Sequence, residues 1–201
     1  MRRALILAAA ASLAFSVAAA QPRAGGAAPD FAVRTAAGER LSLEALSGRT
    51  VILEWSDAAC PFVAKHYDSG AMQRLQKRIT GDGSVWVTVF SPTADGARPP
   101  DAEAALRLTE TRGAKPTHVV VDADGSLAAA FGAKTAPHVF VLDGEGRLRY
   151  QGAVDTIVST DPADVVRADS YLGSAAEALR TGAQVIVPRT LPYGCPLAGA
   201  P

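Results

Sequence analysis

The most distinctive chemistry in this 201-residue chain belongs to its two cysteines. Cys60 lies in "EWSDAACPFV", directly before Pro61, and Cys195 lies far downstream in "PYGCPL". A thiolate attacks disulfides, and a second thiol releases the mixed disulfide that results. Val63 occupies the position where a C-x-x-C exchange motif carries that second cysteine. Cys60 is therefore a reactive thiol without a partner, a thiol with a remote partner, or half of a structural disulfide.

The segments around Cys60 predict a strand followed by a helix. The run "TVILEWS" (50–56) is nearly all apolar, which is typical of a strand buried on both faces of a parallel sheet. Pro61 begins a predicted helix over 61–79, since proline is tolerated in the first turn. The unpaired N–H groups and positive end of that helix favour a thiolate, whereas Asp57 opposes it. We expect a partly exposed, moderately reactive thiol; the alternative is a small buried apolar residue.

The rest of the chain continues an α/β pattern. Two short strands and a helical turn are predicted over 31–46, further strands at 84–91, 118–122, 137–143 and 148–152, and helices at 101–112, 126–132 and 161–182. The tail 183–201 is too rich in proline for regular structure. Strand–helix–strand units, an antiparallel hairpin and a terminal helix predict a central mixed β-sheet with helices on both faces. This is the element order of the thioredoxin-like fold.

Three blocks carry a family resemblance: "TVILEWSDAACPFVAKHY", "FGAKTAPHVFVLDGEGRLRYQGAVD" and "VPRTLPYGC". In this order they resemble the peroxiredoxin-like branch of the alkyl hydroperoxide reductase/thiol-specific antioxidant (AhpC/TSA, redoxin) family, from about Ala28 to Cys195. The resemblance implies a redoxin domain over 30–182 and thiol redox activity at Cys60.

The resemblance also implies a substrate-binding surface around the cysteine. Pro137 matches the family's cis-proline, which lies beside the reactive thiol, and a cis X–Pro bond is a specific structural device. The Ala136 backbone would then be free to pair with an extended substrate, next to Pro61 and Phe62. The alternative is an ordinary trans proline at the start of an edge strand.

Two further roles follow from the resemblance. Glu54 matches a buried acid beneath the cysteines that relays protons during exchange; alternatively it turns outward and pairs with a lysine or arginine. Cys195 matches a "GC" near the family's C-terminus and is the proposed resolving or stapling partner of Cys60, within one chain or across a dimer. An extended chain from Gly182 to Cys195 spans roughly 43–47 Å, which is long enough for this contact.

Other activities remain as alternatives. Peroxiredoxins carry P-x-x-x-[T/S]-x-x-C, but Leu53 and Asp57 occupy the proline and Thr/Ser positions relative to Cys60. Thiol-dependent peroxidase activity is therefore the second hypothesis, and a redox-silent binding domain with a structural disulfide is the third. A metal site that joins His66 and His138 to the cysteines is disfavoured because no two cysteines are closely spaced. We expect neither a metal nor a cofactor.

Charge and composition restrict the partners. The 20 basic and 20 acidic residues cancel and do not cluster, which argues against a nucleic-acid or anionic-membrane surface. The expected partners are a disulfide-bearing protein or a small thiol or disulfide substrate, together with an external thiol reductant. The oligomeric state is left open.

The N-terminus predicts export. Arg2 and Arg3, an apolar stretch and "AAA" before Gln21 form a secretory signal over 1–20, too short and too rich in alanine for a membrane span. We expect a periplasmic or extracellular protein, in an oxidising compartment where disulfides persist. A flexible leader over 21–29 is expected to precede the domain.

Overall fold

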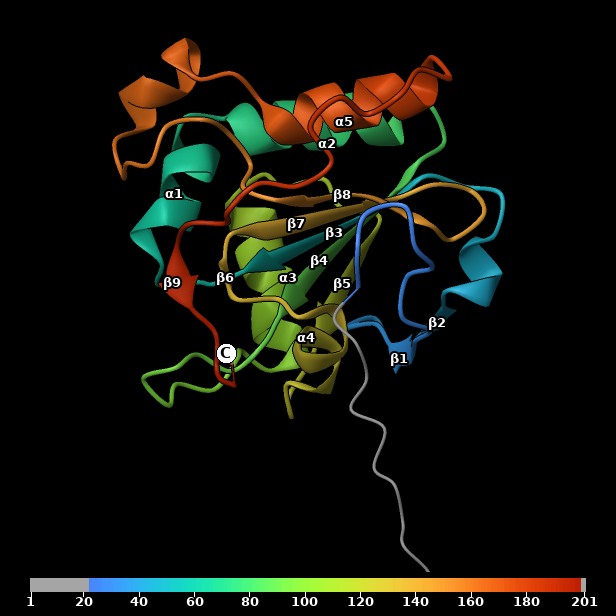
Figure 1. The fold of residues 1–201 in the computed structure, drawn as a ribbon. Helices are drawn as coiled ribbons and strands as arrows, with labels where there is room; N and C mark the ends of the chain where they lie inside the picture. Colours follow the sequence, from blue (N-terminus) through green and yellow to red (C-terminus); the bar gives the residue numbers. More distant parts are fainter. Residues whose placement is uncertain (1–21, 200–201) are drawn as a thin grey trace, which may run out of the picture.

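A computed structural model describes residues 22–199 of the chain (Figure 1). The predicted signal segment 1–20 lies outside these residues. Among the described residues, the helices are all too short or too polar to cross a bilayer.

The centre of the molecule is a five-stranded mixed sheet in the order β5-β4-β3-β7-β8. Its strands are β3 (Val51–Ser56), β4 (Val85–Phe90), β5 (His118–Val121), β7 (His138–Leu142) and β8 (Leu148–Gly152). The first three pair in parallel, and β7 and β8 add antiparallel. Every residue of β3, β4 and β7 is buried, as their continuous apolar sequences predict. The prediction of a central mixed sheet is confirmed.

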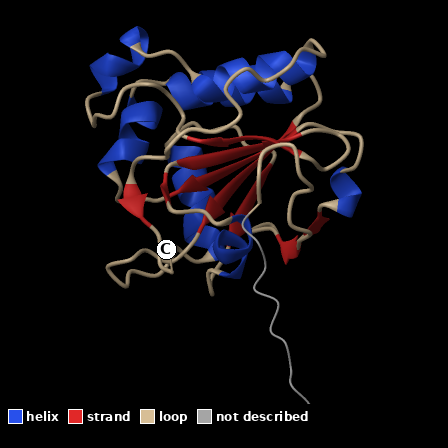
Figure 2. Cartoon of the chain, in the orientation of Figure 1, coloured by secondary structure: helices blue, strands red, loops and turns tan. Residues whose placement is uncertain are grey.

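Helices cover both faces of this sheet (Figure 2). They are α1 (Pro61–Asp68), α2 (Ala71–Thr80), α3 (Ala102–Thr111), α4 (Ser126–Phe131) and α5 (Tyr171–Arg180), with 3₁₀ turns η1 (Glu44–Leu46) and η2 (Pro162–Arg167). Helices α2 and α5 lie on one side, and α3 and α4 on the other (Figure 1). Trp55 of β3 packs against Phe131 of α4 and Phe140 of β7, which ties the sheet to its helical cover.

Two predicted helices differ from the structure. The span 61–79 is two helices, because the chain turns at Gly70, whose φ of +70° is left-handed and favours glycine. The predicted last helix is also divided. Pro162 begins the 3₁₀ turn η2, and α5 starts anew at Tyr171, where the Ser170 hydroxyl accepts a hydrogen bond from the Gly173 N–H.

Both ends of the described chain are attached to the domain. The small sheet of β1 (Ala32–Arg34) and β2 (Arg40–Ser42) precedes η1. Residues 22–28, for which composition predicts a flexible leader, hydrogen-bond to the β7–β8 hairpin, for example from the Gly25 N–H to the Leu148 carbonyl. In the tail, β9 (Cys195–Pro196) pairs with β6 (Thr135–Ala136). The expectation that the tail lacks regular structure is therefore wrong at β9.

Candidate active site

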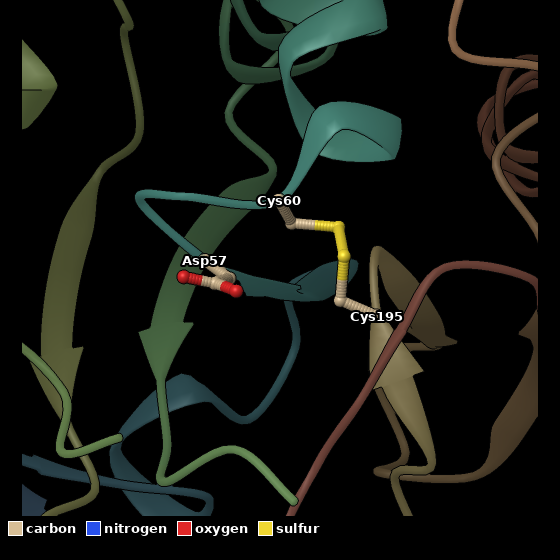
Figure 3. A group of neighbouring side chains, drawn as sticks. All are labelled: Asp57, Cys60 and Cys195. Atoms are coloured by element: carbon tan, nitrogen blue, oxygen red, sulfur yellow. A yellow bond between two sulfur atoms is a disulfide. The ribbon is translucent and has the colours of Figure 1, made fainter. Parts of the chain in front are cut away.

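A disulfide joins Cys60 to Cys195 within one chain (Figure 3). Cys60 is the N-cap residue of α1, and Cys195 is the first residue of β9, with Cα atoms 5.9 Å apart. The predicted position of Cys60 between a strand and a helix is confirmed. The partner of Cys60 is therefore the remote cysteine Cys195 of the same chain.

The tail buries Cys60. Its exposed fraction is 1%, so the expectation of a partly exposed thiol is wrong for this oxidised form. The reason is β9, which is joined to Cys60 by the disulfide and lies beside β6. Cys195 itself is half-buried, so an attacking thiol reaches the disulfide most readily from the Cys195 side.

The bond between Ala136 and Pro137 is cis, as predicted. The Sγ atom of Cys60 lies 3.1 Å from the Ala136 carbonyl oxygen. In the disulfide this sulfur carries no proton, so the contact becomes a hydrogen bond only when Cys60 is a thiol. The sequence led us to expect a free Ala136 backbone, but Ala136 pairs with Cys195 in the antiparallel β6–β9 ladder. The protein's own tail occupies the strand position expected for a substrate.

Gly194 brings the tail against the cis-proline loop. A Cβ atom at this position would lie 2.1 Å from the Ala136 carbonyl oxygen and 3.0 Å from the Pro137 nitrogen. Both neighbours are backbone atoms that cannot move aside as a flexible side chain does. The φ of +147° at Gly194 is a further reason for glycine. The residue before Cys195 must therefore lack a side chain for this docking.

A buried polar cluster fixes the tail two residues before Cys195. The Lys65 ammonium, fully buried on α1, donates to Asp155 Oδ2 at 3.0 Å, to the Ile157 carbonyl at 2.6 Å and to the Tyr193 hydroxyl at 3.3 Å. The Tyr193 hydroxyl also hydrogen-bonds to Asp155. Burial and the neighbouring carboxylate hold the pKa of Tyr193 above its usual range, so its hydroxyl stays protonated and donates. Buried charges need such partners, and this cluster links the helix that carries Cys60 to the segment that carries Cys195.

The loop before Cys60 is held by Arg112 and by its own aspartate. The Arg112 guanidinium donates to the carbonyls of Asp57 and Ala58, both at 3.2 Å. It also lies over the Tyr67 ring, 4.8 Å from the centroid. The Asp57 carboxylate accepts the Ala59 N–H at 3.0 Å, which fixes this carboxylate beside the disulfide (Figure 3).

Glu54 is buried beneath this helix–strand junction, so the alternative of an outward side chain is wrong. Its carboxylate accepts hydrogen bonds from the side chains of Tyr67, Trp86, Thr88 and Gln76. Burial raises the pKa of Glu54 despite these donors. Its hydrogen-bond partners within residues 22–199 do not include either cysteine, so the proton relay stays a prediction.

Of the residues predicted to bind substrate, Pro61 is exposed and Phe62 is half-buried. The Phe62 ring packs edge-on against Tyr193, with centroids 5.9 Å apart. The tail therefore covers Phe62 as well as Ala136.

The two cysteines of the disulfide and the neighbouring Asp57 form the one group of potential metal ligands in residues 22–199. A ligand atom from each of Asp57, Cys60 and Cys195 lies within 4.8 Å of the others, and within residues 22–199 neither His66 nor His138 joins them. Both sulfurs are in a disulfide and neither is a thiolate, which is the form that binds metals. In this oxidised form the residues do not fit a metal centre.

Sequence reasoning missed the residues that position the cysteines. Lys65, Asp155 and Tyr193 belong to no motif that indicates a role beside Cys60. Arg112 is the last residue of the predicted helix 101–112, and its position there gives no sign of a contact with the loop before Cys60. The available signal was that Asp155 and Tyr193 lie at or near the ends of the blocks that carry the family resemblance.

Comparison with known proteins assigns the family. Residues 24–151, more than half of the chain, match the model of the AhpC/TSA family. The chain belongs to the AhpC/TSA family. The predicted resemblance to this family is thereby confirmed. Solved structures with the same fold support the thioredoxin-like arrangement of the chain.

Those structures share the fold at low sequence identity. A hypothetical protein of Sinorhizobium meliloti 1021 has a TM-score of 0.69 and 23% identity, covering 89% of this chain and 95% of its own. An uncharacterised conserved protein of Geobacillus kaustophilus has a TM-score of 0.67 and 21% identity, covering 85% and 89%. A putative thiol:disulfide interchange protein DsbE of Chlorobium tepidum has a TM-score of 0.53 and 22% identity, covering 65% and 85%. No curated protein sequence matches the AhpC/TSA chain significantly.

Proposed function

We propose that this chain is an exported thiol–disulfide oxidoreductase in which Cys60 is the nucleophile and Cys195 the resolving thiol. The observation that carries the proposal is the Cys60–Cys195 disulfide beside the cis peptide bond of Pro137. A local C-x-x-C motif is unnecessary because the tail supplies the second thiol to the N-terminus of α1.

The reaction is two successive thiol–disulfide exchanges. The Cys60 thiolate attacks one sulfur of a substrate disulfide, forms a mixed disulfide with it and expels the other sulfur as a thiolate. The Cys195 thiolate then attacks the Cys60 sulfur, forms the Cys60–Cys195 disulfide and releases the second substrate thiolate. The substrate gains two electrons and the protein loses two. An external thiol reductant restores both cysteines by the same chemistry in reverse.

The substrate is an extended segment of a disulfide-bearing protein or a small disulfide. When Cys60 and Cys195 are reduced and β9 leaves β6, the Ala136 backbone becomes available for pairing with such a segment. The surface formed by Ala136 and Pro137 should bind substrates with a small residue next to the cysteine most easily, because Gly194 occupies that position without a side chain. Pro61 and Phe62 then border the substrate on the helix side, and Glu54 is the candidate proton relay.

The predicted signal segment 1–20 supports an activity in the periplasm or outside the cell, where substrate disulfides exist. The redoxin domain spans 30–182, and the tail 183–201 works as part of the active site through Cys195.

The test uses the mature chain and two cysteine variants with a peptide that contains one disulfide. We expect the reduced protein to reduce the peptide and Cys60→Ser to lose the activity. Cys195→Ser should perform the first exchange and then accumulate a Cys60–peptide mixed disulfide, visible as an intact-mass increase. Equal peptide reduction by all three proteins, at the uncatalysed rate, would mean that the disulfide is only structural.

A parallel measurement separates the peroxidase alternative. Family membership is the observation in its favour, and the incomplete peroxide motif at Leu53 and Asp57 is against it. Consumption of hydrogen peroxide by the wild type but not by Cys60→Ser, without peptide reduction, would replace the oxidoreductase proposal by a peroxidase.

A further inference from the structure

A cavity of about 560 Å³ lies beside the β6–β9 ladder and is unused by the proposed exchange reaction. It is lined by Gly132, Lys134 and His138, which flank β6, and by the tail segment 189–192. Pro22 and Arg23 of the N-terminal segment and Gln151 of β8 complete the lining. Its volume is within the roughly 300–1,000 Å³ of typical small-molecule sites.

The charges around this cavity are all positive. Arg23, Lys134 and Arg189 line it, and the lining contains no acidic residue. Within residues 22–199, none of these three cations forms an ion pair. The chain as a whole has 20 basic and 20 acidic residues, so three unpaired cations around one cavity depart from its average surface. Three like charges around one space repel one another, and an anion in the cavity would offset that repulsion.

A buried neutral histidine adds a hydrogen-bond donor. His138 lines the cavity and is only 4% exposed. Its Nδ1 accepts a hydrogen bond from the backbone N–H of Lys134 at 3.1 Å, so the ring proton lies on Nε2. That N–H has no hydrogen-bond partner within the described part of the chain. Burial, together with the charges of Lys134 and Arg189, which line the same cavity, lowers the pKa of His138 to about 3, so the ring is neutral.

We propose that this cavity binds a small multivalent oxyanion, a carboxylate or phosphate compound, through Lys134, Arg189 and Arg23, with the His138 Nε2–H as an additional donor. Arginine and lysine form strong charge-assisted hydrogen bonds with both classes of oxyanion. The site is separate from the Cys60–Cys195 exchange and does not depend on it.

Anion binding has a consequence for His138. The bound negative charge opposes the effect of Lys134 and Arg189 on the ring and favours the imidazolium. The pKa of His138 should therefore rise when the cavity is filled, from the low value that burial and the two cations set.

The experiment titrates the oxidised mature chain at low ionic strength with citrate, with pyrophosphate, and with chloride as a monovalent control. Calorimetry measures affinity, and the His138 ring resonances, assigned with His138→Gln, report the pKa. We expect saturable binding of citrate, pyrophosphate or both, little binding of chloride, and an upward shift of the His138 pKa. Citrate alone would identify a carboxylate ligand, and pyrophosphate alone a phosphate ligand.

Matched variants locate the site. Lys134→Gln/Arg189→Gln should weaken binding by at least about tenfold, which corresponds to ~1.4 kcal/mol. Lys77→Gln/Arg40→Gln removes the same charge from α2 and β2, where both side chains are exposed, and should bind as the wild type does. The proposal is overturned if neither anion binds saturably, or if both double variants lose affinity equally. Because the readout is binding, its failure leaves the exchange chemistry of Cys60 untouched.

Discussion

At the scale of single residues, two opposing fields act on Cys60. The N-terminus of α1 favours a thiolate, and the Asp57 carboxylate, with an oxygen within 4.8 Å of both sulfurs, opposes it. The helix N-terminus lowers the pKa of a thiol and the carboxylate raises it, so the two have opposite effects on the fraction of reactive thiolate. Asp57 therefore moderates the thiol.

Replacing Asp57 by asparagine should make reduced Cys60 more reactive. Asparagine still accepts the Ala59 N–H that the carboxylate accepts now, so the loop should keep its shape. Removal of one charge at this distance is worth about 1 kcal/mol even when water screens the pair fully, so we expect alkylation at least roughly fivefold faster near neutral pH. Iodoacetamide kinetics on reduced Cys195→Ser protein, followed over pH, measure it. Asp68→Asn, at the far end of α1, is the control; equal rates in both variants would show that Asp57 has no such effect.

Glu54 makes stability depend on pH. Burial raises the pKa of Glu54 above its value in the unfolded chain, so the folded protein holds this proton more tightly. The resulting stabilisation is complete below about pH 4.5 and is lost as the pH rises through the folded-state pKa. Glu54→Gln cannot ionise, so its free energy of unfolding should fall less than that of the wild type over this range. Urea unfolding of both oxidised proteins from pH 4 to 8 measures this; parallel curves would mean that Glu54 titrates normally.

Single residues also show what a sequence can and cannot predict about the site. The position of Cys60 follows from a local pattern, the apolar strand before it and Pro61 after it, whereas the cis bond at Pro137 was implied by the family resemblance. The Lys65–Asp155–Tyr193 cluster joins a helix, a loop and the tail, so its members become neighbours only through the fold. The burial of Cys60 is missed for the same reason.

At the scale of elements, the strands are predicted better than the helices. Buried parallel strands are recognisable from continuous apolar runs such as 51–56 and 85–90. The helical pattern of 61–79 continues across Gly70, and periodicity alone does not reveal the left-handed turn there. Strand β9 has two residues, too few for any periodicity, and it exists only because β6 lies opposite.

The β6–β9 ladder should fail when Gly194 acquires a side chain. In Gly194→Ala the new Cβ would overlap the Ala136 carbonyl oxygen, so the tail must lift from the cis-proline loop. We expect the Cys60–Cys195 disulfide to be reduced more readily, by at least about tenfold in the equilibrium with glutathione, equivalent to ~1.4 kcal/mol. Gly182→Ala is the matched control, because Gly182 also has a positive φ but nothing within 4 Å of the added Cβ. Equal disulfide equilibria in the two variants would contradict tight docking.

At the scale of the whole molecule, the disulfide closes a loop of 135 positions, from the first helix after β3 to the last strand. The reach of the tail bounds which cysteines can meet, but reach alone does not select them. Selection comes from contacts spread over the molecule: the Lys65 cluster, the pairing of Ala136 with Cys195, and the hydrogen bonds of Thr190 to Tyr150 and to the Ala153 N–H. The Lys65 and Thr190 contacts keep the tail near Cys60 without the disulfide, even when β9 leaves β6 to admit a substrate.

The oxidised protein should therefore be far more stable than the reduced one. Closing so long a loop restricts the unfolded chain and stabilises the fold by up to about 5 kcal/mol. Urea unfolding of the oxidised wild type against Cys60→Ser/Cys195→Ser should show a difference of roughly 2–5 kcal/mol, with a smaller m value for the cross-linked chain because its unfolded state is more compact. Wild type treated with reductant should match the double variant. By the same thermodynamic cycle, the fold favours the disulfide by this free energy, so oxidised protein is the stable product of turnover and an external thiol must drive its reduction. If oxidised and double-variant proteins unfold at the same urea concentration, the fold does not favour this disulfide, and the tail thiol is not held for exchange.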